Sequence, residues 1–212
     1  MKQSVYLHKD YSQNGEQRII EKYFLHKIGN LLDIGANDGI TFSNSHALIK
    51  AGWAAVLVEP SPKAFQKLHN VYNGFDIVQC LELAIGMNNG SAVLKESGSL
   101  LNQGDIALVS SFLPEEQARW TSLNMPFEDV PVEVVDVKSL LKRTYIENFD
   151  FVSIDIEGME KVVVPQFDFN AIGAKMVCIE FNSKDQTFFD RHMTHQGYKL
   201  IHKNAENLLY AK

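Results

Sequence analysis

The chain has 212 residues, of which 45% are hydrophobic and 22% charged, and its formal net charge at pH 7 is −6. This length and composition suit a globular protein with a sizeable core, and they exclude a disordered or fibrous chain. The acidic balance disfavours a nucleic-acid binder that depends on overall positive charge, and it gives no general attraction to an anionic membrane surface.

The first part of the chain alternates predicted helices and strands after an N-terminal arm, which together with the first helix fills residues 1–29. Buried strands are predicted where short apolar runs end at turn residues, and helices where apolar residues recur at helical spacing. These criteria predict strands at 30–34, 54–58 and 76–84 and helices at 16–27, 41–51 and 61–72. Ser61 suits the N-cap of the last of these helices, and Pro62 suits its first position.

The middle of the chain is less regular. Strands are predicted at 91–95 and 130–137, and a short helix at 138–145. Between the two strands, residues 96–129 are rich in Ser, Gly, Asn and Pro and show no sustained periodicity. Because excursions of this length are usually functional or mobile, we expect this segment to lie on the substrate side of the site.

The alternation resumes in the last part of the chain. Strands are predicted at 149–156 and 175–181, helices at 159–164 and 185–195, and a terminal hairpin from 198–202 and 207–210. Alternating strands and helices favour a parallel sheet covered on both faces. The sequence therefore predicts a doubly wound, mostly parallel α/β sheet with a C-terminal antiparallel hairpin, built as one domain over residues 1–212, with its sites at the carboxyl ends of the strands.

A glycine-bearing turn follows the first predicted strand. Gly35 and Gly39 lie in a Gly-x-x-x-Gly spacing, and Glu59 ends the second strand. A dinucleotide site has the Gly-x-Gly-x-x-Gly spacing, whose middle glycine makes room for a pyrophosphate, and an acid about 20 residues further on that binds a ribose. This sequence has the acid without the middle glycine. It therefore predicts an adenosine-bearing ligand without a pyrophosphate, such as S-adenosylmethionine, unless both glycines serve only the turn and Glu59 is a solvated strand end.

Four sequence blocks together resemble the FkbM family of S-adenosylmethionine-dependent methyltransferases. They are Leu32-Asp33-Ile34-Gly35-Ala36-Asn37-Asp38-Gly39, Val58-Glu59-Pro60-Ser61-Pro62, Ala84-Ile85-Gly86 and Ile154-Asp155-Ile156-Glu157-Gly158. The resemblance implies a Rossmann-like fold of the class I methyltransferase type. It also implies transfer of a methyl group to an oxygen, with hydroxyls of sugars, glycans or polyketide-like metabolites as usual acceptors. Relatives often work beside glycosyltransferases, so a glycosyltransferase partner or a fusion to one is expected.

The resemblance also assigns a cofactor site. Gly35, Asn37 and Gly39 would line the methionine end of the cofactor, Glu59 would hold the ribose, and Ala84 would lie near the adenine. Gln13, in the arm, would close over the cofactor. The full set of cofactor residues expected in this way is Gln13, Asp33, Gly35, Asn37, Gly39, Glu59, Pro60 and Ala84.

Acidic residues after two later strands are the candidates for catalysis. An aliphatic hydroxyl attacks a methyl group well only while its proton is being removed, and a positioned carboxylate can do this. We expect Asp155 to be the base, with Glu157 sharing the role or orienting the loop, and Glu180 and Asn182 to bind substrate. In the alternative, Asp155 or Glu157 caps the following helix, because acids favour helix N-termini.

A divalent cation, Mg²⁺ or Mn²⁺, is a second version of the same site. Asp155, Glu180 and Asn182 would offer the hard oxygen ligands that such ions prefer. The resemblance does not require an ion, and the sequence assigns no metal ligand.

Two other functions fit the predicted fold. A dinucleotide-dependent oxidoreductase or epimerase lacks support because the middle glycine and a Tyr-x-x-x-Lys pair are missing. A non-catalytic binding module is disfavoured because both the glycine turn and the Asp-x-Glu-Gly block are intact.

The cysteines and the apolar runs indicate a compartment. Cys80 and Cys178 form no disulfide framework, which is typical of a reducing environment. The first residues lack the apolar core of a signal peptide, and no apolar run approaches the ~20 residues of a membrane helix. We therefore expect a cytoplasmic protein without a membrane span.

Overall fold

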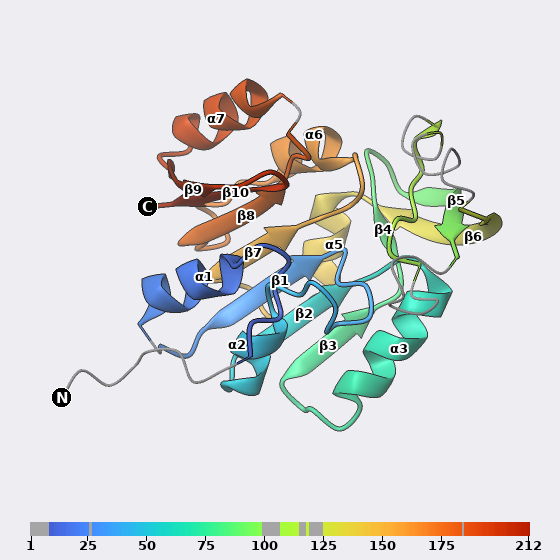
Figure 1. Ribbon diagram of the computed structural model, residues 1–212, viewed down its shortest axis with the longest axis horizontal. Helices are drawn as coiled ribbons and strands as arrows, with labels where there is room; N and C mark the ends of the chain where they lie inside the picture. Colours follow the sequence, from blue (N-terminus) through green and yellow to red (C-terminus); the bar gives the residue numbers. More distant parts are fainter. Residues whose placement is uncertain (1–8, 26, 99–106, 115–117, 119–124, 184) are drawn as a thin grey trace.

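The computed structural model describes residues 9–25, 27–98, 107–114, 118, 125–183 and 185–212. Within these residues the main sheet has seven strands in the order β3-β2-β1-β7-β8-β10-β9 (Figure 1). These strands are β1 (Asn30–Ile34), β2 (Ala54–Val58), β3 (Val78–Leu81), β7 (Phe151–Ile154), β8 (Met176–Glu180), β9 (Lys199–Lys203) and β10 (Asn207–Ala211).

The direction of the strands confirms the predicted fold class. From β3 to β8, neighbouring strands are parallel, whereas β10 is antiparallel to both β8 and β9. The predicted terminal hairpin is thus present. Its second strand, β10, lies inside the sheet between β8 and β9, and its first strand, β9, forms the edge.

Helices cover both faces of this sheet, because its central strands β1, β2, β7 and β8 are buried along almost their whole length. Leu32 and Val56 pack on the face covered by α5, α6 and α7, whereas Leu31 and Ala55 pack on the face covered by α1, α2 and α3. Full burial of an aliphatic side chain of this size stabilises the fold by about 1.5–3 kcal/mol. The helices are α1 (Glu16–Phe24), α2 (His46–Lys50), α3 (Pro62–Tyr72), α5 (Val137–Arg143), α6 (Glu160–Val163) and α7 (Gln186–His195), and the 3-10 helix η1 (Val164–Gln166) follows α6.

A smaller sheet stands beside the carboxyl ends of the main strands. It has the order β4-β6-β5, with β4 (Ala84–Ile85), β5 (Gly90–Ser97) and β6 (Phe127–Val135). Glu96 of β5 fixes this sheet to the start of α3, because its buried carboxylate accepts a 2.6 Å hydrogen bond from Ser61 Oγ and lies 3.3 Å from Lys63 Nζ. The second sheet is therefore held next to the end of β2.

Two predicted elements end differently in the structure. The strand predicted at 76–84 is shorter, and Ala84 belongs to the small sheet. The excursion predicted at 96–129 is bounded by strand residues, since β5 and β6 pair antiparallel as far as Ser97 and Phe127. Much of its interior, residues 99–106, 115–117 and 119–124, lies outside the described residues.

The helix predicted at 41–51 is wrong in its first half, because α2 begins only at His46. Side chains near the glycine turn bond to backbone groups that a helix would use. The Asp38 carboxylate accepts hydrogen bonds from the backbone N–H groups of Ile40 and Thr41, at 2.9 and 2.7 Å. Phe42 has a φ of 55°, in the left-handed region. Local side-chain bonds of this kind compete with helix formation.

The structure also bears on the predictions about disulfides and membrane-spanning helices. Cys80 and Cys178 are both free thiols. In the part of the chain that the structure describes, no helix is both long and apolar enough to cross a bilayer. The cytoplasmic location stays a prediction.

Candidate functional site

A cavity of about 280 Å³ opens at the carboxyl ends of the main strands. Its lining brings together eleven of the twelve residues that the sequence proposes for the site. These are Gln13, Asp33, Gly35, Asn37, Glu59, Pro60, Ala84, Asp155, Glu157, Glu180 and Asn182. The volume is close to the lower end of the range for small-molecule sites, about 300 Å³.

Gly39 is the predicted residue that does not line the cavity. It lies behind the turn against α3, where its carbonyl accepts a 2.9 Å hydrogen bond from the Tyr72 hydroxyl. A Cβ at Gly39 would lie 2.6 Å from a Leu68 methyl carbon and 2.7 Å from the Tyr72 ring. Gly39 therefore lets the turn pack on the helix.

Gly35 lies at the crossing of two strand ends. Its N–H donates to the Val58 carbonyl at 2.9 Å, and its φ is +89°, which side-chain-bearing residues rarely adopt. A Cβ at this position would lie 1.6 Å from the Asp155 carbonyl oxygen. Only glycine allows the loops after β1 and β7 to approach this closely.

Glu59 is held by the backbone of the glycine turn. Its buried carboxylate accepts hydrogen bonds from Asn37 N–H at 2.9 Å and from Ser61 N–H at 2.8 Å. Burial raises the pKa of the Glu59 carboxyl to about 7, although both backbone hydrogen bonds oppose that rise. Each oxygen keeps a further lone pair that a ligand hydroxyl can use.

Asp33 lies deeper, where β1 ends. Its carboxylate accepts a 2.6 Å hydrogen bond from Ser45 Oγ, just before α2. Burial raises the pKa of Asp33 to about 6, against the effect of that hydrogen bond. Asp33 thus fixes the segment between the glycine turn and α2 to the end of β1.

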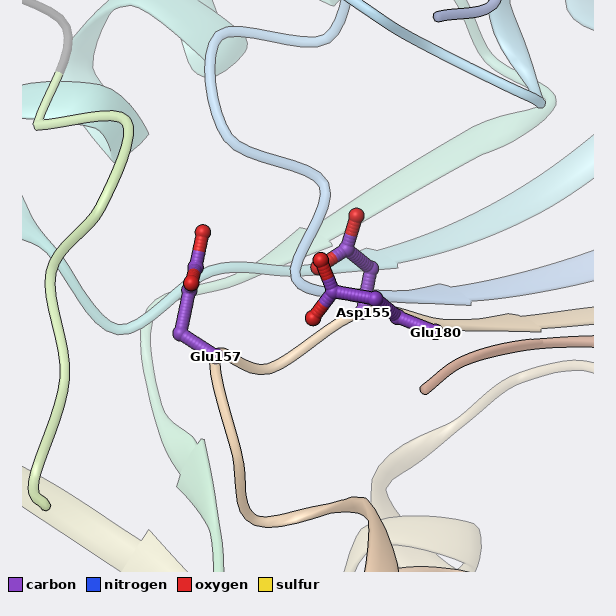
Figure 2. A group of neighbouring side chains, drawn as sticks. All are labelled: Asp155, Glu157 and Glu180. Atoms are coloured by element: carbon purple, nitrogen blue, oxygen red, sulfur yellow. The ribbon is translucent and has the colours of Figure 1, made fainter. Parts of the chain in front are cut away.

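Three carboxylates gather at the ends of β7 and β8. Asp155 directly follows β7, Glu180 is the last residue of β8, and Glu157 lies on the loop between β7 and α6. One oxygen from each lies within 4.8 Å of the others. Figure 2 shows the carboxyl groups of Asp155 and Glu180 next to each other, with Glu157 on the adjoining loop.

Burial and mutual contact shift the acidity of two of these groups. Burial raises the pKa of Asp155 to about 6, while its hydrogen bond with the Glu180 carboxyl opposes the rise. Burial, with the neighbouring charge of Asp155 next in importance, raises the pKa of Glu180 well above its usual range. Two adjacent carboxyls cannot readily both ionise, so each raises the free-energy cost of ionising the other.

The loop after β7 is shaped by Glu160, a residue that the sequence reading missed. Its buried Oε1 accepts hydrogen bonds from the N–H groups of Ile156 at 2.9 Å and Gly158 at 3.2 Å. Glu157 has a φ of 52°, and its carbonyl accepts a 2.8 Å hydrogen bond from Ser111 Oγ. The acid that binds the backbone at the start of α6 is thus Glu160.

Glu16, a second acid that the sequence did not single out, holds the N-terminal arm against the cavity. Glu16 is fully buried and accepts hydrogen bonds from Asn14 N–H at 2.8 Å and Asn207 Nδ2 at 2.9 Å. The Asn14 side chain donates to Glu206 at 2.8 Å. These contacts join the arm to the start of β10 and bring Gln13 to the cavity wall. The contact of Glu16 with Asn207, which is 191 residues away in the sequence, leaves no local pattern from which the role of this glutamate could be predicted.

Comparison with known proteins identifies relatives of this fold. A model of the methyltransferase FkbM domain matches residues 33–200. A search of curated proteins found no match.

Three solved structures illustrate the similarity, which at these identities concerns the fold. The FkbM methyltransferase from Methylobacillus flagellatus KT is 16% identical with a TM-score of 0.53, and the match covers 87% of this chain and 44% of that one. WbdD is 11% identical with a TM-score of 0.52 over 99% of this chain and 45% of its own. The precorrin-6y C5,15-methyltransferase from Geobacter metallireducens GS-15 is 11% identical with a TM-score of 0.50, and the match covers 100% of this chain and 95% of that one. This chain therefore spans under half the length of the Methylobacillus protein and of WbdD.

Proposed function

Because the chain belongs to the methyltransferase FkbM family, we propose that it is an S-adenosylmethionine-dependent O-methyltransferase acting on a hydroxyl of a sugar or glycan. The observation that carries the proposal is the meeting of three strand ends at one cavity, with the Gly35 turn after β1, Glu59 after β2 and Asp155 after β7.

The cofactor half of the cavity fits an adenosine-bearing ligand. Glu59 offers buried carboxylate oxygens for the two hydroxyls of a ribose, and the Gly35 turn lets the ligand approach the backbone. Ala84 and Pro60 add apolar surface beside them for a base. When bound, S-adenosylmethionine supplies an electrophilic methyl group.

The acidic half of the cavity fits an alcohol acceptor. Asp155 and Glu180 accept hydrogen bonds from hydroxyls, and Asp155 takes the hydroxyl proton as the oxygen attacks the methyl carbon. The raised pKa of Asp155, about 6, brings it closer to the pH at which a general base works best. Glu157 and Asn182 line the same side and orient the acceptor.

The charge of the cavity supports a neutral acceptor over a phosphate-rich one. The charged side chains in its described lining are all acidic, so a nucleic-acid backbone brought to this surface would be repelled. A sugar presents hydroxyls, which donate to carboxylates. We propose that a glycosyltransferase, as a partner or a fused domain, supplies the acceptor.

Calorimetry with S-adenosylhomocysteine, followed by transfer from labelled S-adenosylmethionine to a panel of glycosides, tests this function. We expect Asp155→Asn to lower transfer by about 10²–10⁴-fold, the usual contribution of a general base, while binding S-adenosylhomocysteine normally. Asp76→Asn, an exposed acid near β3, is the matched control and should transfer like the wild type.

Two results would contradict the proposal. If S-adenosylhomocysteine does not bind at millimolar concentration, the protein is not an S-adenosylmethionine-dependent methyltransferase. If Asp155→Asn transfers the methyl group at a rate near that of the wild type, Asp155 is not the general base.

A further inference from the structure

We propose that Asp155, Glu157 and Glu180 bind one divalent cation, and the catalytic use of that cation rests on the function proposed above. The carboxylate oxygens are hard ligands, of the kind that Mg²⁺, Mn²⁺ and Ca²⁺ prefer. The sequence suggested Asn182 as the third ligand, whereas the structure groups Glu157 with Asp155 and Glu180. Asn182 lines the same cavity.

The spacing of the three oxygens suits a single ion. They lie within 4.8 Å of one another. Two ligands on opposite sides of an ion are separated by twice the metal–oxygen distance, which is about 4.2 Å for Mg²⁺ and about 4.8 Å for Ca²⁺. Three oxygens 4.8 Å apart lie about 2.8 Å from a common centre, so side-chain movements of about 0.4–0.7 Å would bring all three to the metal–oxygen distance of Ca²⁺ or Mg²⁺.

Glu180 supplies an observation that is independent of the spacing. Its side chain is only 6% exposed, and its Oε2 is buried without a hydrogen-bond partner. A buried carboxylate oxygen without a partner costs free energy, which a ligand entering from the cavity would recover. Because Glu180 lines the cavity, that ligand can reach it from solvent.

The charge around the cluster points to a cation. The described residues that line the cavity include no Lys, Arg or His. They include six acids, which are Asp33, Glu59, Asp155, Glu157, Glu180 and Glu206. The described side chains that line the cavity around the cluster are therefore acidic, neutral or apolar. A divalent cation would offset the charge of these acids.

A bound cation would also meet the acceptor. The protein ligands come from the strand ends and the loop after β7, so the remaining coordination positions face the cavity. An acceptor hydroxyl at one of these positions would be held in place and made more acidic by the cation. The cation and Asp155 would thus act on the same hydroxyl.

Titration of Mn²⁺ into the full chain, freed of metal with EDTA and then desalted, tests the site directly. Electron paramagnetic resonance of free Mn²⁺ reports binding without any need for activity. We expect one Mn²⁺ per chain, displaced by excess Mg²⁺ or Ca²⁺. An undiminished free Mn²⁺ signal at millimolar protein and metal would overturn the proposal.

Two variants locate the bound ion. Glu180→Gln and Glu157→Gln should each weaken Mn²⁺ binding by at least about tenfold, since each removes one charged ligand. Glu157 is the less buried of the two, so its variant remains informative if Glu180→Gln does not fold. Glu147→Gln, an exposed acid before β7, is the control and should bind Mn²⁺ like the wild type. Equal binding by all three variants would overturn the site.

Calorimetry with S-adenosylhomocysteine, in EDTA and in Mn²⁺, separates this proposal from the proposed function. Binding of Mn²⁺ without binding of the nucleoside would support the cation site and count against the methyltransferase. If the protein binds the nucleoside but takes up no Mn²⁺ in the titration, the cation site is overturned and the proposed methyltransferase function stands.

Discussion

At the scale of single residues, Gly35 connects the backbone of two strands to the site. Its positive φ and the closeness of the Asp155 carbonyl leave no room for a side chain. A larger residue here would push apart the loops after β1 and β7, which carry the proposed cofactor and acceptor groups.

We therefore expect Gly35→Ala to abolish cofactor binding and to lower stability. A positive φ is unfavourable for alanine, and a contact of 1.6 Å forces the backbone to move. Calorimetry with S-adenosylhomocysteine and a thermal melt would measure the two effects. Gly74→Ala is the control, because Gly74 also has a positive φ but a Cβ there would meet nothing within 4 Å. Normal cofactor binding by Gly35→Ala would contradict this account of the turn.

Most of the candidate site could be predicted from residue types and from their positions after apolar runs in the sequence. Gly35, Glu59 and Asp155 each follow a short apolar run, so their place at strand ends could be read directly. Glu16, Glu160 and Glu206 could not be found in this way. Their importance comes from backbone and side-chain partners that only the folded chain brings near them.

At the scale of elements, the central strands β1, β2, β7 and β8 were predictable because they are buried on both faces and therefore form continuous apolar runs in the sequence. β1 and β2 have the predicted bounds. The helix after the glycine turn was predicted too early because Asp38 and Ser43 bond to the backbone and delay its start. The division of residues 76–85 between two sheets depends on tertiary pairing that local patterns do not contain.

The start of α3 gives a test at this scale. Ser61 Oγ accepts a 3.1 Å hydrogen bond from Ala64 N–H and donates to the buried Glu96 carboxylate at 2.6 Å. Ser61→Ala should destabilise the protein by about 1–3 kcal/mol, because it removes the helix cap and leaves Glu96 with fewer partners.

Urea unfolding of Ser61→Ala would measure this loss. Ser61→Thr keeps the hydroxyl and should recover part of the stability. A change below about 0.5 kcal/mol, the usual range for surface substitutions, would show that the cap and the contact with β5 contribute little.

At the scale of the whole molecule, the buried acids of the cavity make stability depend on pH. Folding raises the pKa of Asp33 from 3.8 to about 6 and that of Glu59 from 4.5 to about 7, chiefly through burial. Between these values the folded chain holds protons that the unfolded chain has released. The stability from the neutral carboxyls is fully present below about pH 4 and is lost as the pH rises through about 6 and 7.

The ligand-free protein should therefore melt at a lower temperature at pH 8 than at pH 5. Over this pH interval the loss is about 1.4 kcal/mol for Asp33 and about 2.7 kcal/mol for Glu59. Thermal melts in buffers of matched ionic strength would measure it. Asp33→Asn should flatten the profile, whereas Asp76→Asn, at an exposed position, should not. A melting temperature that rises steadily from pH 5 to pH 8 would contradict this reading of the buried acids.

The order of the last two strands has a consequence for synthesis on the ribosome. β10 leaves the ribosome after β9, yet it occupies the position between β9 and β8. Until residue 211 has emerged, the β8 backbone faces an open edge, and an open edge can pair with a neighbouring nascent chain. Capture of the nascent chain by a chaperone before β10 has emerged would protect this edge.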